Sequence, residues 1–326
     1  LMATYIGIKG VEIQTIAGDP ANPIEGQVWY NTTANTMKGY VLTFGTGAWT
    51  SGGVTSSIHS HNGGAAGTNT AAIIATGIPP ANPVPLSAAE EYNGTGWTTV
   101  NNCNSSSNQL GSTGAGTTSS MLMFGGETSP KKSSESYNGT TWTITNLMNE
   151  DHPMVCGAGT SSEAAIGCGS SPKNKNSESW NGVSWTATSP TNIDSIQRAG
   201  AGTATACFAI TGDNAPKQQV EEWNGSAWST GTAVTTGGEG MGAAGTVAQC
   251  IKFGGVPNHA QTEQWNGTSW TEVADLATGR DYVGYCGATV SNGLCIGGTT
   301  GPTGNSTATE EWAMPTPLAT KTFTSS

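Results

Sequence analysis

The chain has 326 residues, of which 10% are charged, and its formal net charge is −11 at pH 7. This acidic balance argues against nucleic acid as a partner, and the absence of a run of about 18 apolar residues argues against membrane insertion. The N-terminus has neither the basic start nor the apolar core of a secretory signal.

Strand and turn signals alternate over residues 1–50. The segment from Pro23 to Thr33 reads PIEGQVWYNTT, and MKGY follows at residues 37–40 and GAW at residues 47–49. Short runs of aromatic and β-branched residues between glycine and asparagine are typical of strands joined by turns. We therefore predict a small β module over residues 1–50.

A short phrase that ends in tryptophan recurs along the rest of the chain. In five copies two aromatic residues flank an Asn-Gly pair, as in YNGTGW at residues 92–97, and a sixth copy breaks off after Trp312. The leading aromatic residues are 42 to 47 residues apart, which indicates an array of similar supersecondary units. Asn-Gly tolerates positive φ and predicts a hairpin in each copy. The repeated aromatic residues are Tyr92, Trp97, Tyr137, Trp142, Trp180, Trp185, Trp223, Trp228, Trp265, Trp270 and Trp312.

Each unit is predicted to contain four short strands. A segment of small residues comes first, then an apolar run closed by glycine, then Glu-x-aromatic, then Trp-Thr or a variant of it. Glycine, serine and threonine between frequent turns disfavour a helical reading. The ranges predicted for the first strand are 66–68, 114–117, 157–160, 200–203, 244–246 and 288–289.

This order of segments resembles the kelch repeat over residues 51–314. Kelch units form the blades of a β-propeller, so the resemblance implies an all-β fold: a six-bladed kelch-like β-propeller with a small N-terminal β module. The stretch EGxxWYNTT at residues 25–33 is similar to a module that begins many fibre and appendage proteins of bacteriophages, especially marine ones, although Met37 stands where leucine is commoner. Both resemblances imply a protein of the virion.

The sixth unit lacks its fourth strand. GTGAWT at residues 45–50 looks like the missing half, because Trp49 precedes Gly64 by 15 residues, as Trp142 precedes Gly157. We predict that the strand around Trp49 completes the last blade, which would close the ring and remove its exposed edges. The alternative donor is TKTFT at residues 320–324, in a segment otherwise predicted as a C-terminal tail over 315–326.

A glutamate stands two residues before the leading aromatic residue in every unit. Its repetition indicates a structural role, such as bonding to nearby backbone amides, rather than a catalytic carboxylate pair. With two arginines and four histidines in the chain, we expect no enzyme, no cofactor and no metal. His59 and His61 could chelate a metal, but we expect solvated loop histidines. The seven cysteines are expected to be buried free thiols, because stacked sheets are ~10 Å apart and disulfides need Cα atoms within ~7 Å.

One face of the predicted propeller should carry the long and variable loops. In an up-and-down sheet of four strands, the 2–3 and 4–1 connections share a face, here called the loop face. Seven of the 11 basic residues fall there, and variable loops on a rigid scaffold often bind partners, although polar loops can also be merely solvated. The predicted binding residues are Lys131, Lys132, Lys173, Lys175, Lys217, Arg198, Arg280, His152 and His259.

These patterns together indicate a non-enzymatic structural protein of a bacteriophage virion, in a tail fibre, an appendage or the capsid, assembled in the host bacterial cytoplasm. Its expected partners are other virion proteins and a host cell-surface glycan, within a trimeric or hexameric homo-oligomer. The alternative function is a receptor-binding lectin or adhesin that recognises host surface glycan. A polysaccharide depolymerase is less favoured.

Overall fold

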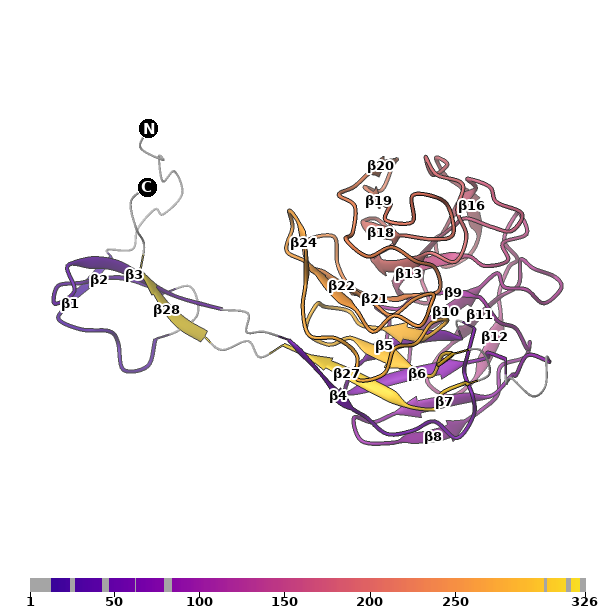
Figure 1. The fold of residues 1–326 in the computed structure, drawn as a ribbon, viewed down its shortest axis with the longest axis horizontal. Coiled ribbons are helices and arrows are strands. Elements are labelled where there is room, and N and C mark those ends of the chain that lie inside the picture. Colours follow the sequence, from indigo (N-terminus) through magenta and orange to yellow (C-terminus); the bar gives the residue numbers. More distant parts are fainter. Residues whose placement is uncertain are drawn as a thin grey trace. The chain divides into compact units, whose positions relative to one another are not determined.

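The computed structural model describes residues 13–23, 27–42, 47–61, 63–78, 84–301, 304–314 and 318–322. The regular elements in these ranges are strands. None of the described residues forms a helix that could cross a membrane. The chain divides into two compact units (Figure 1). Residues 47–314 form the repeat unit, and residues 1–46 together with 315–326 form the terminal unit.

The described strands of the repeat unit form six antiparallel sheets of four strands each, as the repeat predicts. The first three sheets consist of β5 (Gly64–Thr68), β6 (Ala71–Ala75), β7 (Ala89–Tyr92) and β8 (Trp97–Val100); β9 (Gly111–Ser112), β10 (Met121–Phe124), β11 (Ser134–Tyr137) and β12 (Trp142–Ile144); and β13 (Cys156–Ser161), β14 (Ala164–Cys168), β15 (Ser177–Trp180) and β16 (Trp185–Ala187). The other three consist of β17 (Ala199–Gly202), β18 (Cys207–Ile210), β19 (Val220–Trp223) and β20 (Trp228–Thr230); β21 (Gly242–Gly245), β22 (Cys250–Phe253), β23 (Thr262–Trp265) and β24 (Trp270–Glu272); and β25 (Gly284–Cys286), β26 (Leu294–Ile296), β27 (Thr309–Ala313) and β4 (Ala48–Ser51).

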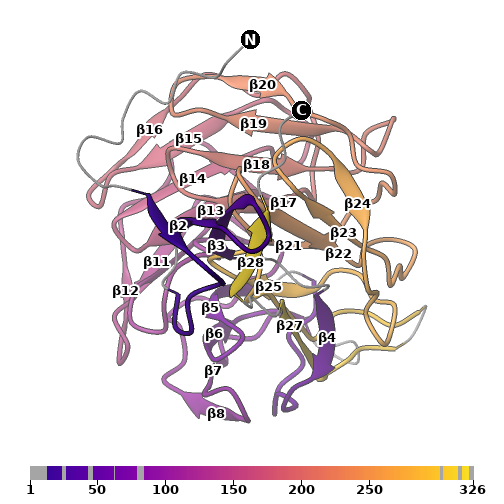
Figure 2. The same cartoon turned by 90° about the vertical axis from the view of Figure 1, so that its left-hand side faces the viewer.

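The first strand of each sheet lies nearest the centre of the repeat unit, and the sheets are arranged radially in a propeller-like manner (Figure 2). Neighbouring first strands contact one another in succession, and β25 of the sixth sheet contacts β5 of the first. A Cβ atom on Gly200 would lie 2.1 Å from the carbonyl oxygen of Gly157. Glycine at such positions therefore allows the innermost backbones to approach this closely.

The repeated aromatic residues lie between sheets and are buried, apart from Trp97, which is half-buried. The two rings of a hairpin lie side by side, and in the fourth sheet the ring centroids of Trp223 and Trp228 are 5.4 Å apart. The second ring reaches the preceding sheet, where Trp228 Nε1 donates a hydrogen bond to Ser177 Oγ at 3.3 Å. These side chains therefore join each sheet to its neighbour.

The strand at Trp49 pairs with the sixth unit. In this pairing Trp49 lies opposite Trp312, so β4 is the fourth strand beside β27. The Trp49 ring also lies 4.7 Å from that of Phe253 in the fifth sheet. Of the two donors considered from the sequence, the N-terminal one therefore supplies this strand.

The C-terminal segment is not a separate tail. Strand β28 (Leu318–Thr322) pairs with β3 (Thr36–Leu42), which pairs in turn with β2 (Val28–Asn31) and, through it, with β1 (Gln14–Ile16). The predicted boundaries are corrected in two places, because β4 belongs to the repeat unit and 315–326 to the terminal unit. Backbone pairing between segments far apart in sequence decides both changes.

The motif of the terminal unit is organised around one carboxylate. Asp19 accepts hydrogen bonds from Asn31 Nδ2 at 2.7 Å, from Trp29 Nε1 at 3.2 Å and from Lys38 Nζ at 2.9 Å. These bonds, that of Lys38 first, lower the pKa of Asp19. Tryptophan and asparagine of the WYNTT motif therefore have structural partners here, whereas residues 25 and 26 of the motif lie outside the described residues.

The seven cysteines are buried and form no disulfide, which confirms the expected free thiols. Burial raises the pKa of Cys103 and of Cys295 to about 12. A thiol with such a pKa stays protonated at neutral pH and is chemically unreactive.

The first strand differs from its predicted position in two sheets. In the second sheet β9 ends before the predicted range 114–117, where Gly116 N donates to Thr113 O at 2.7 Å in a tight turn. In the sixth sheet β25 ends before residues 288–289, which lead into a turn with Asn292 N donating to Thr289 O at 3.3 Å. Local turns end the strand pairing there, so the spacing of the repeat alone placed these two strands too far along the chain.

Removing β4 should destabilise the repeat unit. A chain of residues 53–314 would lack Trp49 and expose an edge of β27, so we expect it to be less stable than residues 47–314 by at least about 3 kcal/mol. Chemical unfolding of the two chains, followed by circular dichroism, measures this difference. Equal stabilities would mean that β4 contributes little to the sixth sheet.

Candidate functional site

Each sheet of the repeat unit carries one buried glutamate in its third strand. Its carboxylate accepts hydrogen bonds from backbone amides of the loop that leads into the first strand; Glu178 is bonded by Asn149 N at 2.9 Å and by Glu150 N at 3.0 Å. The six glutamates, each at most 3% exposed, are Glu90, Glu135, Glu178, Glu221, Glu263 and Glu310. The structural role predicted from their repetition is confirmed, because each carboxylate fastens a loop to its sheet.

Five of these carboxylates also contact a buried basic side chain. The pairs are His59–Glu90 (3.1 Å), His152–Glu178 (3.0 Å), Arg198–Glu221 (2.7 Å), Lys252–Glu263 (2.9 Å) and Arg280–Glu310. A buried carboxylate is costly to desolvate, so a hydrogen-bonded basic partner offsets part of that cost.

Three residues predicted to bind a partner at the surface are interior instead. Arg198, Arg280 and His152 are at most 3% exposed, and each is paired with the glutamate of its own sheet. The expectation that His59 is solvated is also wrong, since it is fully buried. The sequence placed these residues correctly in loops, but it did not indicate that the loops fold inward onto a carboxylate.

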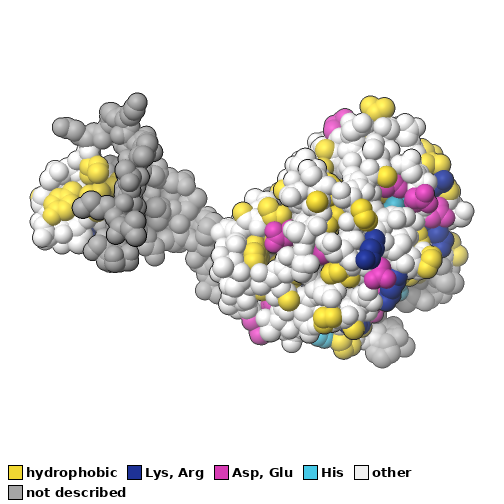
Figure 3. Space-filling model, turned by 90° about the horizontal axis from the view of Figure 1, so that it is seen from above, with side chains coloured by type: hydrophobic (Ala, Val, Ile, Leu, Met, Phe, Trp, Pro, Cys, Tyr) yellow, Lys and Arg dark blue, Asp and Glu magenta, His cyan; other side chains and the backbone are white. Residues whose placement is uncertain are grey.

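The lysines of the loop face lie beside acidic residues. The ion pairs are Lys131–Glu127 (3.4 Å), Lys173–Asp213 (2.8 Å) and Lys217–Glu239 (3.7 Å). Lys132 and His259 are half-buried, and Lys175 is exposed. Figure 3 shows basic and acidic side chains side by side along one side of the repeat unit. The loop face thus carries a belt of mixed charge rather than a basic patch, and exposed pairs of this kind stabilise a fold little.

Acid should weaken the repeat unit through its glutamates. Burial alone would raise the pKa of Glu178, but hydrogen bonds from His152 and from backbone amides outweigh it and lower the pKa from 4.5 to about 2; Glu90 behaves in the same way with His59. A carboxyl with a lowered pKa in the folded state contributes stability that is present above its unfolded pKa and is lost as the pH falls through the folded one.

We therefore expect the Tm to fall as the pH drops from about 5 to about 2. Glu178→Gln, which cannot titrate, should show a smaller fall over the same range. Thermal unfolding followed by circular dichroism at a series of pH values measures both slopes. Equal slopes in the two proteins would contradict this assignment.

A second cluster, the axial ring, forms where the six loops enter the first strands. Its members occupy equivalent positions, and all have positive φ: His61 (60°), Gln109 (54°), Met154 (60°), Gln197 (56°), Gly240 (65°) and Tyr282 (49°). Backbone hydrogen bonds join neighbours, as from Gln109 N to His61 O at 2.7 Å, and the His61 and Tyr282 rings stack with centroids 5.1 Å apart. Left-handed backbone in non-glycine residues is a form of strain that is concentrated at functional sites.

Four members of the axial ring carry a polar or aromatic side chain, and of these Gln109 and Gln197 are buried whereas His61 and Tyr282 are half-buried. Burial lowers the pKa of His61, which favours its neutral imidazole. Burial, followed by the charges of Glu239 and Asp281, raises the pKa of Tyr282 to about 12. Among the described residues, Oε1 of Gln109 is buried without a hydrogen-bond partner. Amide, imidazole and phenol groups can both donate and accept hydrogen bonds, which suits a neutral ligand rich in hydroxyl groups.

The sequence pattern missed the axial ring because its members share no residue type. Their common register, two or three positions before each first strand, could have found it. From the sequence, His61 was considered as a partner of His59 for a metal and expected to be a solvated loop histidine. The structure separates the two, since His59 contacts Glu90 and His61 stacks on Tyr282. No group of three metal-ligating side chains occurs among the residues that the structure describes.

No protein-family model matches the sequence, and no curated protein matches it either. The structure is similar to a solved structure described as "Structure of YjhT", with a TM-score of 0.62 at 16% sequence identity, covering 79% of this chain and 96% of the other. At this identity the similarity concerns the fold alone. It supports a propeller-like all-β array of four-stranded sheets.

Proposed function

We propose that this chain is a non-enzymatic structural protein of a bacteriophage virion, in which the repeat unit is displayed for contact with other proteins or with the host surface. The proposal rests first on the similarity of residues 25–33 to the module of phage fibre and appendage proteins. In this role the protein is part of a homo-oligomer, trimeric or hexameric, that assembles in the host cytoplasm.

The structural observation that supports the proposal best is the pairing of β28 with β3. The two ends of the chain thereby build one small unit, and the repeat unit is an insertion between them. Strands β4 and β27, through which the chain enters and leaves the repeat unit, are paired side by side. In this arrangement the terminal unit would attach to the particle and carry the inserted repeat unit, as expected of a displayed domain.

The proposal includes a closed ring of six blades. Its support is the contact between the first and sixth sheets, where Trp97 Nε1 donates to Thr309 Oγ1 at 2.9 Å and β25 lies against β5. Closure would leave no open end to the array, so the short outermost strands of the sheets would be its remaining edges. The resulting rigid body would keep the loop face in a constant geometry.

A density map of purified phage particles tests this proposal. We expect the chain in the particle, six blades in its propeller, and contacts with neighbouring virion proteins concentrated on residues 2–50 and on the C-terminal segment from Pro315. The loop face should be open to solvent. Absence of the chain from particles by mass spectrometry would refute the virion role.

A second candidate function is recognition of a host surface glycan, and the axial ring favours it. The stacked rings of His61 and Tyr282 and the amides of Gln109 and Gln197 combine an aromatic surface with hydrogen-bonding groups. A glycan array with the full-length protein and with Tyr282→Ala tests this candidate. Binding that is lost in Tyr282→Ala and kept in Val183→Ala, a change at an exposed hairpin position, would support it. A loop face covered by another virion protein in the particle would exclude it.

A further inference from the structure

The carboxylate of Glu135 in the second sheet differs from the other five. Glu135 is 2% exposed, and it accepts hydrogen bonds from Asn104 N at 2.9 Å, Asn104 Nδ2 at 3.1 Å and Ser105 N at 2.7 Å. Among the described residues it has no basic partner, unlike its five counterparts. A buried carboxylate with one side left uncompensated is a strong acceptor for a positively charged donor.

The third sheet provides the matched comparison. Glu178 accepts the same three kinds of hydrogen bond, from Asn149 N, Asn149 Nδ2 and Glu150 N, and a fourth contact comes from His152 Nε2 at 3.0 Å. His152 lies three residues after Asn149 in the loop. The residue three positions after Asn104 is Ser107, which has no basic group.

The basic partners in the other sheets come from three positions. The loop position just described supplies His59, His152 and Arg280. The residue before the first strand supplies Arg198, and the residue opposite the glutamate in the second strand supplies Lys252. Each route brings a basic group to the carboxylate.

In the second sheet none of these three positions carries a basic residue. The loop position is Ser107, the residue before the first strand is Leu110, and the residue opposite Glu135 in the second strand is Met123. The spatial equivalence is close. A Cβ atom on Gly126 would meet Ser107 Oγ at 2.4 Å and Leu110 Cδ2 at 2.7 Å. In the fourth sheet, a Cβ atom on the corresponding glycine would meet Ser195 Oγ at 2.2 Å and Arg198 Cγ at 2.9 Å.

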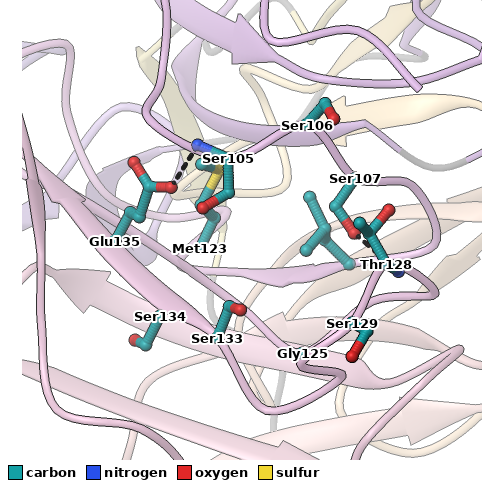
Figure 4. Close-up of a pocket in the computed structure, with 11 residues that line it drawn as sticks. Ser105, Ser106, Ser107, Met123, Gly125, Thr128, Ser129, Ser133, Ser134 and Glu135 are labelled. Atoms are coloured by element: carbon teal, nitrogen blue, oxygen red, sulfur yellow. Dashed lines mark hydrogen bonds between the residues drawn. The ribbon is translucent and has the colours of Figure 1, made fainter. Parts of the chain in front are cut away.

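A recess of about 40 Å³ opens at this place, between the Glu135 carboxylate and the loop of Thr128 and Ser129 (Figure 4). Ser107, Leu110 and Met123 all line it. A single water needs roughly 10–15 Å³ of such space, so the recess accommodates a group of about three or four heavy atoms. A guanidinium group, which the fourth and sixth sheets supply from Arg198 and Arg280, has four heavy atoms and is of this size.

The neighbouring acceptors define what would fit. In the third and sixth sheets the basic group also contacts the carbonyl that follows the second strand, His152 Nδ1 with Gly169 O at 3.0 Å and Arg280 Nη1 with Gly297 O at 3.2 Å. The counterpart in the second sheet is Gly125, which lines the recess. An occupant therefore needs a positive charge and N–H donors in two directions, which a guanidinium or a primary ammonium group has.

We infer that this recess is a binding site for a small organic cation, a guanidinium or alkylammonium group, which takes the place that the histidine, arginine or lysine side chain occupies in the other five sheets. The occupant is either a free amine or guanidine or the basic side chain of another protein. The inference is independent of the proposed virion role, since it concerns the interior of one sheet.

Methylguanidinium is the probe for the test, with tetramethylammonium, which has the charge but no N–H donor, as the control cation. Full-length protein should bind methylguanidinium saturably with one site in calorimetric titration, and its Tm should rise relative to an equal concentration of tetramethylammonium. Ser107→His, which places in the second sheet the residue that the third sheet uses, should abolish binding. Binding that is absent in the unaltered protein, or unchanged in Ser107→His, would overturn the inference.

The reciprocal change gives a second and independent readout. His152→Ser should create the same recess in the third sheet, so we expect this variant to bind a second equivalent of methylguanidinium and to regain stability with it. A single site in a folded His152→Ser variant would contradict the inference. Titration with an acetylated arginine amide then distinguishes the two possible sources of the cation, a protein side chain and a free small molecule. Affinity equal to that for methylguanidinium indicates that a protein side chain can enter, and weaker affinity indicates a free small cation.

Discussion

Replacement of Trp228 by alanine is expected to lower the free energy of unfolding by about 3–5 kcal/mol. Trp228 is 6% exposed and lies in the cluster between the third and fourth sheets, with Ile166 and Cys207. The sheets on both sides are held by their own hydrogen bonds and cannot close the cavity that alanine would leave. Ser177 Oγ would also lose the indole hydrogen bond.

The matched control is Val183→Ala in the hairpin of the third sheet. Val183 is 69% exposed, so its truncation should change the free energy of unfolding by at most about 0.5 kcal/mol. Denaturant unfolding followed by circular dichroism compares the two variants. If Trp228→Ala costs less than about 1 kcal/mol, the repeated tryptophans do not hold the sheets together, and a role as surface ligands would have to be considered for them.

Replacement of Arg198 by methionine should destabilise the protein by about 3–5 kcal/mol, because it leaves Glu221 buried without its charged partner. Arg198 Nη1 donates to Glu221 Oε2 at 2.7 Å, and Nη2 donates to Ala209 O at 2.8 Å. Methionine keeps much of the aliphatic volume, so the loss reports mainly on the pair. The double variant Arg198→Met/Glu221→Gln should recover part of the lost stability, since the uncompensated charge is then removed.

Lys173→Met is the control for this prediction. The pair of Lys173 with Asp213 lies at the surface, with the lysine side chain 39% exposed, and such pairs contribute about 0–1 kcal/mol. Urea unfolding of the four proteins gives the three differences. Equal losses in Arg198→Met and Lys173→Met would show that burial does not distinguish the two pairs.

Local pattern in the sequence determined the strands and the hairpins of the repeat unit. The Asn-Gly pairs predicted hairpins, and the structure has positive φ at the glycine of each pair, as at Gly94 (86°). The asparagine stabilises the turn through its side chain, as Asn93 Oδ1 accepts from Thr95 N and Gly96 N at 3.0 Å. The recurrence of glutamate at one register predicted a structural carboxylate, and the structure confirms its bonds to backbone amides, as from Ser56 and Ser57 to Glu90. Hairpins and these glutamate contacts form between residues of one unit, so each copy of the unit shows the same sequence pattern.

Only the tertiary structure decided which charges are interior and which segments pair across the chain. Lys173 and Arg198 look alike in the sequence as basic loop residues, yet one is exposed and the other is buried against Glu221. The basic partner comes from different positions in different sheets, and within the described part of the chain Glu135 has none, so no single register reveals it. The pairing of β28 with β3 and the axial ring likewise depend on contacts between residues far apart in the chain. Burial and pairing of this kind are properties of the assembled sheets, whereas turn and strand preferences act along the chain itself.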